Sequence, residues 1–326
     1  MKKKVLESAD IISDEKKSKG MIDPVTLMKI KSMEMRARVV VEGFMKGIHK
    51  SPYHGFSVEF TEYRQYTPGD DPRYIDWHLY ARSDRFYIKK FEDETNLRCH
   101  ILLDHSKSMG YGSVGYSKAQ YAGTLAATLA YFMFMQGDAV GLATFDNQIR
   151  QYMPPRNRPG YLHRIMLALE MTPEGKATDL NQPLKNISEM LKRRGLVILM
   201  SDLLTSIDKL ELDLSYLKAN GHDVVLFNVL DPEELNFDFN SPAIFEDIES
   251  GKTFYVDPPA AQKEYADKMK NHMASIKSIC RNLGVDYHLF TTNRPFDLAL
   301  LEFLHDRMHR RKQVRRPGGS SVRSAV

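Results

Sequence analysis

The chain has 326 residues, of which 42% are apolar and 27% charged, and a formal net charge of +4 at pH 7. This is the composition of a globular protein with a large core, in one to three domains. No window approaches the ~20 apolar residues of a membrane span, and residues 1–20 lack the apolar core of a secretory signal. The two isolated cysteines, Cys99 and Cys280, argue against a disulfide framework or a zinc site. We therefore expect a cytoplasmic protein.

The positive charge is concentrated at the two ends of the chain. Lysines occupy positions 2–4, and the other end carries Arg310, Arg311, Lys312, Arg315 and Arg316. Basic tails can bind nucleic acid, anionic membranes or acidic proteins, but no aromatic residues are interleaved with these charges. We expect residues 1–22 and 310–326 to be disordered, solvated tails. Nucleic-acid binding through them is an alternative function that we do not favour.

Residues 23–96 form the first predicted region, a helix followed by a β-rich part. Asp23-Pro24 is a helix start, and Gly43 and Gly47 mark the predicted end of the helix. Strands are expected over residues 56–60 and 86–91.

Between these two strands lies a dense group of arginines, acids and aromatics around a Pro-Gly-Asp-Asp-Pro turn. Its members include Arg64, Asp70, Asp71, Arg73, Asp76, Trp77 and Arg82. The arginines can form a self-contained ionic network with the aspartates, which we favour, or the group can serve as a docking surface.

Strands and helices alternate from residue 97 to residue 309. Apolar runs predict strands over residues 97–104, 139–145, 196–200, 223–230 and 285–291. An antiparallel strand is expected near residues 149–153, a β-hairpin insertion within residues 238–257 and a last helix over residues 295–308. The predicted fold class is α/β, with a doubly wound, mostly parallel sheet and right-handed crossovers, preceded by the small N-terminal helix-plus-β accessory region.

Five oxygen donors are expected at the carboxyl edge of this sheet. Asp104, Ser106 and Ser108 follow one buried strand, at the place where open α/β sheets bind ligands. Alone, such a strand end is more often an ordinary capped loop. Asp202 ends another strand in the same way, and Thr178 stands in a loop that opens a helix on the same side. This donor set suits a hard cation, Mg²⁺ first and Mn²⁺ or Ca²⁺ as alternatives, and has so few carboxylates that the ion would accept another from a partner.

Enzyme sites can be tested against the same residues. Ala177 interrupts the Gly-Lys-Thr pattern of a phosphate-binding loop at residues 175–178. An enzyme that forms an aspartyl-phosphate needs a second acidic residue two positions after the nucleophile, where this chain has Ser106. A serine nucleophile needs a base beside it, and the sequence offers no such partner. We therefore expect a protein that is not an enzyme, with a metal-dependent phosphoester hydrolase as the alternative.

The donor set resembles the metal-ion-dependent adhesion site of the von Willebrand factor A fold. The Asp-x-Ser-x-Ser sequence of that site matches Asp104, Ser106 and Ser108; its threonine matches Thr178, and its later aspartate matches Asp202. The resemblance implies an intact Mg²⁺ site, in which a partner protein typically supplies an acidic residue as the last ligand. The predicted hairpin insertion departs from a minimal domain of this kind.

The stretch from Tyr63 to Arg82 resembles the signature of the domain-of-unknown-function 58 family. The resemblance rests on Tyr63-Arg64-Gln65-Tyr66-Thr67-Pro68-Gly69-Asp70-Asp71, on Arg73 through Asp76-Trp77 and on Tyr80-Ala81-Arg82, and with the metal-site match it covers about residues 36–308. Members are often associated with MoxR-type AAA+ ATPases. The resemblance implies an adaptor that works with such an ATPase in the assembly or maturation of protein complexes.

Overall fold

The computed structural model describes residues 22–50, 62–67, 80, 82, 85–90, 97–171, 181–237, 243–246, 253–256 and 258–304. The chain divides into two units, one formed by Met1–Phe44 together with Arg98–Val326, and the other by Met45–Leu97. The first part of the predicted N-terminal helix is therefore grouped with the α/β unit.

A six-stranded sheet is the centre of the larger unit. Its strands stand in the order β10-β7-β6-β3-β4-β5, and all neighbours are parallel except β4 and β5. The strands are β3 (Arg98–Asp104), β4 (Ala139–Phe145), β5 (Ile149–Arg156), β6 (Leu196–Ser201), β7 (Asp223–Leu230) and β10 (Asp286–Thr291). Every residue of β6 is buried, as expected for a strand that is covered on both faces. The predicted doubly wound, mostly parallel α/β sheet is confirmed.

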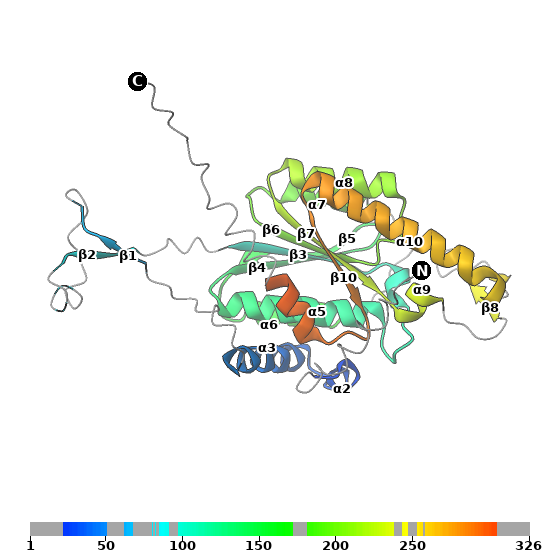
Figure 1. Ribbon diagram of the computed structural model, residues 1–326, viewed down its shortest axis with the longest axis horizontal. Coiled ribbons are helices and arrows are strands. Elements are labelled where there is room, and N and C mark those ends of the chain that lie inside the picture. Colours follow the sequence, from blue (N-terminus) through cyan, green and yellow to red (C-terminus); the bar gives the residue numbers. More distant parts are fainter. Residues whose placement is uncertain are drawn as a thin grey trace, which may run out of the picture. The chain divides into compact units, whose positions relative to one another are not determined.

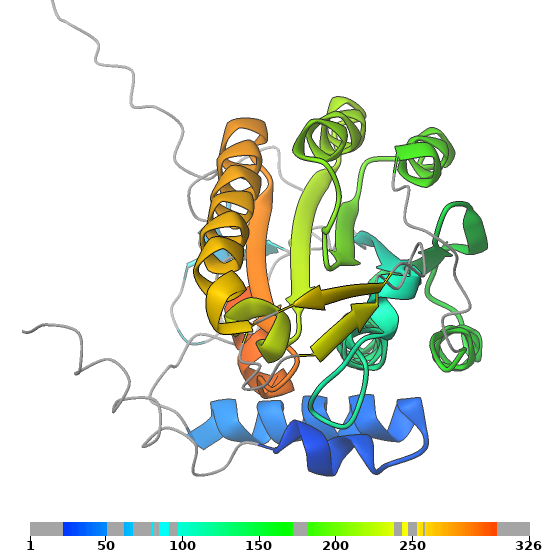
Figure 2. The ribbon, with the colours of Figure 1, turned by 90° about the vertical axis from the view of Figure 1, so that its right-hand side faces the viewer.

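Helices cover both faces of this sheet. Figures 1 and 2 show α5 (Lys118–Met135) and α6 (Tyr161–Leu169) on one face, and α7 (Asn181–Met190), α8 (Ile207–Ala219) and α10 (Pro258–Leu283) on the other. On the second face Leu199, Leu214 and Ile276 belong to one buried apolar cluster. These contacts fix the helices against the strands whose ends carry the candidate site.

Two N-terminal helices, α2 (Pro24–Met28) and α3 (Met33–Lys50), pack on the outer side of α5 (Figure 1). The rings of Phe44 and Phe132 meet edge to face with centroids 6.3 Å apart. The buried Arg36 guanidinium donates to the Thr124 hydroxyl at 2.8 Å. Because α5 is covered on this side as well, it is apolar almost all round.

The prediction of one N-terminal helix that ends near Gly43 or Gly47 is wrong. The chain breaks after α2, and the Ser32 hydroxyl accepts a hydrogen bond from the Met35 amide at 3.3 Å, which begins the second helix. The carboxylate of Glu170, far away in sequence, also accepts from the Met33 amide at 2.9 Å. The second helix then continues through both glycines, because its packing against α5 outweighs their low helix propensity.

The smaller unit contains a two-stranded antiparallel sheet of β1 (Glu62–Gln65) and β2 (Tyr87–Lys90). β2 confirms the strand expected over residues 86–91, whereas the strand expected over residues 56–60 lies outside the described residues. β1 lies at the start of the group of arginines, acids and aromatics, for which no strand was predicted. Pairing across the sheet, extended by the Tyr66 amide donating to the Phe86 carbonyl at 2.9 Å, outweighs the weak strand propensity of this charged sequence.

The segment after β7 contains a short helix and the expected hairpin. α9 (Pro232–Asn236) begins with a capping box formed by Asp231 and Glu234, which the sequence interpretation missed. β8 (Ala243–Glu246) pairs antiparallel with β9 (Thr253–Val256), and this confirms the hairpin. Figures 1 and 2 show the hairpin beyond the sheet edge at which the parallel strands end.

The chain is helical again at residues 296–304. This agrees with the start of the last predicted helix, and its predicted end lies outside the described residues. Within the ranges that the structure covers, no helix is both long enough and apolar enough to cross a membrane.

The burial of His100 in β3 predicts a pH-dependent stability. Burial, and then the charge of nearby His222, lowers the pKa of His100 to about 4, and the two rings are 6.3 Å apart. The unfolded chain takes up this proton near pH 6.5, so stability should fall as the pH decreases from there to about 4, by roughly 3 kcal/mol at most. Urea unfolding at about pH 7 and about pH 5 measures the loss, which should be at least about 1 kcal/mol smaller in His100→Gln. An equal loss in both proteins would contradict the role of His100.

Candidate metal centre

Aspartates end four neighbouring strands at one edge of the sheet. β3 ends at Asp104, and Asp146, Asp202 and Asp231 directly follow β4, β6 and β7; all four are buried. The strand order reverses between β3 and β6, since the chain continues to β4 on one side and to β7 on the other. Ligands of open α/β sheets bind at such a switch point. Asp104 and Asp202 flank it.

The two outer aspartates, Asp146 and Asp231, hold loops in place. Asp146 accepts from the Arg150 guanidinium at 2.8 Å and from the Gln148 amide at 3.0 Å. Asp231 accepts from both the amide and the hydroxyl of Ser113. Burial alone would raise the pKa of both carboxyls, but these hydrogen bonds hold each pKa below its ordinary value. The carboxylate oxygens of Asp146 and Asp231 therefore already accept hydrogen bonds within the fold.

Asp104 differs because, within the part of the chain that the structure describes, its contacts are with neutral donors. Its Oδ1 accepts from the Ser106 amide at 2.8 Å, and its Oδ2 accepts from the Ser201 hydroxyl at 2.6 Å. Burial, and then the negative charge of Asp202, raises the pKa of Asp104 to about 7. A pair of buried carboxylates in this relation favours a bound cation.

Two serine hydroxyls complete the described part of the donor set. Ser106 is fully buried, Ser108 is half-buried, and their Oγ atoms are 3.0 Å apart. Adjacent ligands of an octahedral Mg²⁺ are separated by about 3 Å, because each lies about 2.1 Å from the ion. The described residues contain no cluster of three or more histidine, cysteine or acidic side chains able to hold a metal, so the donors that the structure describes here are two carboxylates and two hydroxyls. The residues present fit a small, hard cation.

Asp202 has a cationic neighbour that the sequence interpretation missed. Its Oδ2 accepts from Lys118 Nζ at 2.9 Å, and its Oδ1 accepts from the Leu204 amide at 3.3 Å. The same Nζ donates to Glu234 Oε1 in α9 at 2.6 Å. The sequence carried only a weak signal: Lys118 begins a helix, where the helix dipole disfavours a cation, but this position alone predicts neither burial nor a partner.

Several predicted residues lie outside the described residues: Thr178, Asp70, Asp71, Arg73, Asp76 and Trp77. Of the remaining signature residues, Arg64 lies in β1 opposite Ile88, and Arg82 is exposed. The structure thus brings Asp104, Ser106, Ser108 and Asp202 to one edge. The role of the signature stretch, as ionic network or docking surface, stays a prediction.

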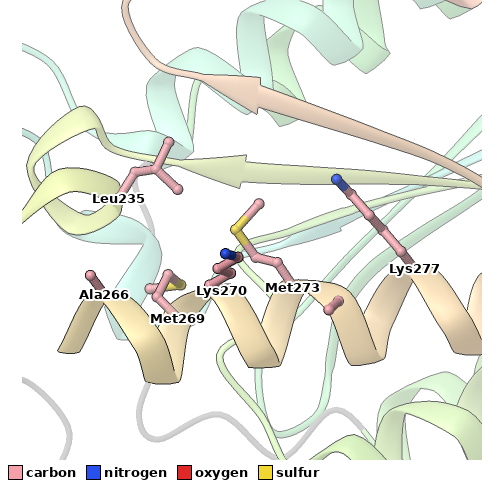
Figure 3. Close-up of a pocket in the computed structure, with 7 residues that line it drawn as sticks. Leu235, Ala266, Met269, Lys270, Met273 and Lys277 are labelled. Carbon is pink, nitrogen blue, oxygen red and sulfur yellow. The ribbon is translucent and has the colours of Figure 1, made fainter. Parts of the chain in front are cut away.

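A separate pocket opens between α9 and α10 (Figure 3). Its volume is about 360 Å³, and it is lined mainly by apolar side chains, among them Leu235, Met269 and Met273, together with Lys270 and Lys277. The described residues that line it include no acid, histidine or hydroxyl group, so they do not extend the donor set of the metal centre.

Fold and donor set together define an α/β domain with a candidate oxygen-ligand site at the switch point of its sheet. The chain belongs to the family described as "Protein of unknown function DUF58", which matches residues 62–275. A relative from Mycobacterium tuberculosis strain H37Rv, "Uncharacterized protein Rv1480", is 24% identical over 290 residues, which are 87% of this chain and 90% of the relative. The "Uncharacterized protein Mb1516" of Mycobacterium bovis matches equally.

Solved structures also align with the chain. The conserved hypothetical protein BatB from Bacteroides thetaiotaomicron is 14% identical, with a TM-score of 0.40 over 65% of this chain and 99% of BatB. The SpRpn10 VWA domain is 12% identical, with a TM-score of 0.36 over 64% of this chain and 94% of that domain. The pilus adhesin SpaC from Lactobacillus rhamnosus GG is 12% identical, with a TM-score of 0.44 over 66% of this chain and 30% of the adhesin.

Proposed function

We propose that this chain is a non-catalytic adaptor that holds a divalent cation at the sheet edge and binds an acidic residue of a partner protein through it. Asp104, Ser106, Ser108 and Asp202 would supply the ligands together with Thr178, and Mg²⁺ is the ion that we expect first. The observation that carries the proposal is the pair of hydroxyls 3.0 Å apart beside two buried carboxylates. The bound ion would supply Lewis-acid attraction for a carboxylate of the partner.

The hydrogen bonds around the site support recognition more than catalysis. The Ser106 hydroxyl faces the Ser108 hydroxyl at 3.0 Å and interacts with the Asp104 carboxylate, which is itself proposed as a ligand of the cation, and no histidine among the described residues hydrogen-bonds to it. His272 lies close to the loop after β6, but its Nε2 faces the Leu203 carbonyl oxygen at 2.9 Å and must donate to it. That nitrogen is therefore not free to accept a proton. These contacts give the alternative of a phosphoester hydrolase no support.

The partner that we propose is a MoxR-type AAA+ ATPase with an acidic residue at its contact surface. This part of the proposal rests on the family. An acidic partner residue also suits the site, because its few carboxylates do not fully neutralise a bound divalent ion. The adaptor would then assist the ATPase in the assembly or maturation of protein complexes.

A pull-down of the purified ATPase by the full-length chain tests this function. Removing Mg²⁺ would also disable the ATPase, so Mg²⁺ should be present throughout, and the comparison should be between wild type and Asp104→Asn. We expect wild type to retain the ATPase and Asp104→Asn to lose at least about 90% of it, because the ion that the partner contacts is absent. Asp146→Asn, altered at the end of the adjacent strand, should bind like wild type. Equal retention by Asp104→Asn would contradict the proposal.

A further inference from the structure

A buried ammonium group lies beside the proposed cation site. Lys118 is the first residue of α5, and its side chain is 0% exposed. Its Nζ donates to Asp202 Oδ2 at 2.9 Å and to Glu234 Oε1 at 2.6 Å. The ammonium thus neutralises one of the two carboxylates proposed as ligands and links it to α9.

The position of Lys118 runs against two general tendencies. Lysine is seldom buried, because its charge loses the solvation of water. A cation in the first turn also faces the positive end of the helix dipole. The carboxylates of Asp202 and Glu234 compensate for both costs. Lys107 differs, because it is exposed although it lies between Ser106 and Ser108 in the sequence.

We propose that Lys118 sets the cation affinity of the site by competing for the Asp202 carboxylate. This inference rests on the proposed function, since it concerns the same site. A divalent cation that shares Asp202 with Lys118 meets the like charge of the ammonium, and its binding is weakened. Glu234 acts in the opposite sense, because it attracts the ammonium toward α9. Lys118 is therefore a positioning residue and not a ligand.

Calorimetric titration of Mg²⁺ into the metal-free full-length chain tests the competition directly. Lys118→Met should bind Mg²⁺ at least about tenfold more tightly than wild type, because Asp202 loses its internal cation. Glu234→Gln should bind at least about threefold more weakly, because Lys118 then keeps Asp202 as its one acidic partner among the described residues. Lys107→Met is the matched control: it removes the same charge from an exposed position in the ligand loop and should change the affinity less than about twofold.

The double variant Lys118→Met/Glu234→Gln separates competition from a general change in charge. Without the ammonium, Glu234 has nothing to attract, so Glu234→Gln should change the affinity less than about twofold in this background. The double variant also guards against a folding failure, because it leaves fewer buried charges without a partner than Lys118→Met alone. If Lys118→Met does not fold, the double variant should bind Mg²⁺ roughly thirtyfold more tightly than Glu234→Gln, because it combines the tenfold gain with recovery of the threefold loss.

The outcomes distinguish this inference from the proposed function. If wild type binds no Mg²⁺ at millimolar concentration, the metal site itself is refuted. If wild type binds Mg²⁺ but loss of Lys118 leaves the affinity unchanged or lowers it, the metal site stands and the competition is refuted. An equal gain in Lys107→Met and Lys118→Met also refutes the competition, since the effect would then be one of net charge.

Discussion

Asp104→Asn is expected to remove Mg²⁺ binding and, at the same time, to stabilise the metal-free protein. The asparagine keeps the size of the side chain and can still accept from the Ser106 amide and donate to the Ser201 hydroxyl, both of which contact Asp104. It removes a buried negative charge that faces Asp202, which should raise the free energy of unfolding by on the order of 2 kcal/mol. Loss of the anionic ligand should weaken Mg²⁺ binding by at least about 100-fold.

Thermal denaturation with and without Mg²⁺ measures both effects of Asp104→Asn. The wild-type Tm should rise with Mg²⁺, because the ion binds the folded state. The variant should start from a higher Tm and show no rise. Asp146→Asn is the control, because its carboxylate is engaged by Arg150; it should be less stable than wild type and keep the response to Mg²⁺. A full response to Mg²⁺ in Asp104→Asn would show that the ion binds elsewhere.

Gly112→Ala is expected to destabilise the fold by about 3 kcal/mol or more and to weaken Mg²⁺ binding. A Cβ at this position would lie 2.0 Å from the Tyr116 carbonyl oxygen, so the loop before α5 would have to open. In that loop the Lys118 amide donates to the Tyr111 carbonyl at 2.8 Å, and the Tyr111 hydroxyl donates to Glu233 at 2.7 Å. The Tyr111 amide also donates to the Ser108 carbonyl at 3.1 Å, so opening the loop would disturb the turn that carries the proposed ligand Ser108.

Gly110→Ala is the matched control for this loop. Beyond its chain neighbours, nothing in the described part of the chain lies within 4 Å of a Cβ built at position 110, so the free energy of unfolding should change by less than about 0.5 kcal/mol. Urea unfolding of the two variants gives the comparison, and a Mg²⁺ titration gives the effect on the site. If both alanine substitutions lower the free energy of unfolding by the same amount, the close approach of Tyr116 to Gly112 is not what makes Gly112→Ala destabilising.

Periodicity in the sequence was sufficient to predict the sheet, because a buried parallel strand is apolar along its whole length. The run at residues 196–200 became β6 for this reason. The break between α2 and α3 was not predictable in the same way, because it depends partly on Glu170, a residue far away in sequence that binds the Met33 amide. β1 was missed because a charged stretch becomes a strand only through its pairing with β2.

Part of the candidate site followed from the same reasoning. Asp104 and Asp202 could be placed at one edge because the carboxyl ends of adjacent parallel strands meet there, and the structure has β3 and β6 as neighbours. Lys118 and Glu234 could not be assigned from spacing, because Lys118 reaches Asp202 and Glu234 only through tertiary packing. Ser201 precedes Asp202 directly, but its hydroxyl turns to Asp104 across the β3–β6 pair.

The most direct test of the metal site is the anomalous diffraction of crystals of the full chain grown with Mn²⁺. Mn²⁺ prefers the same oxygen ligands as Mg²⁺ and has a measurable anomalous signal. We predict one strong peak at the carboxyl edge of the sheet, about 2.2 Å from the hydroxyl oxygens of Ser106 and Ser108. The peak should be absent in Asp104→Asn crystals grown under the same conditions. A strong peak elsewhere, with none beside the two serines, would contradict the account.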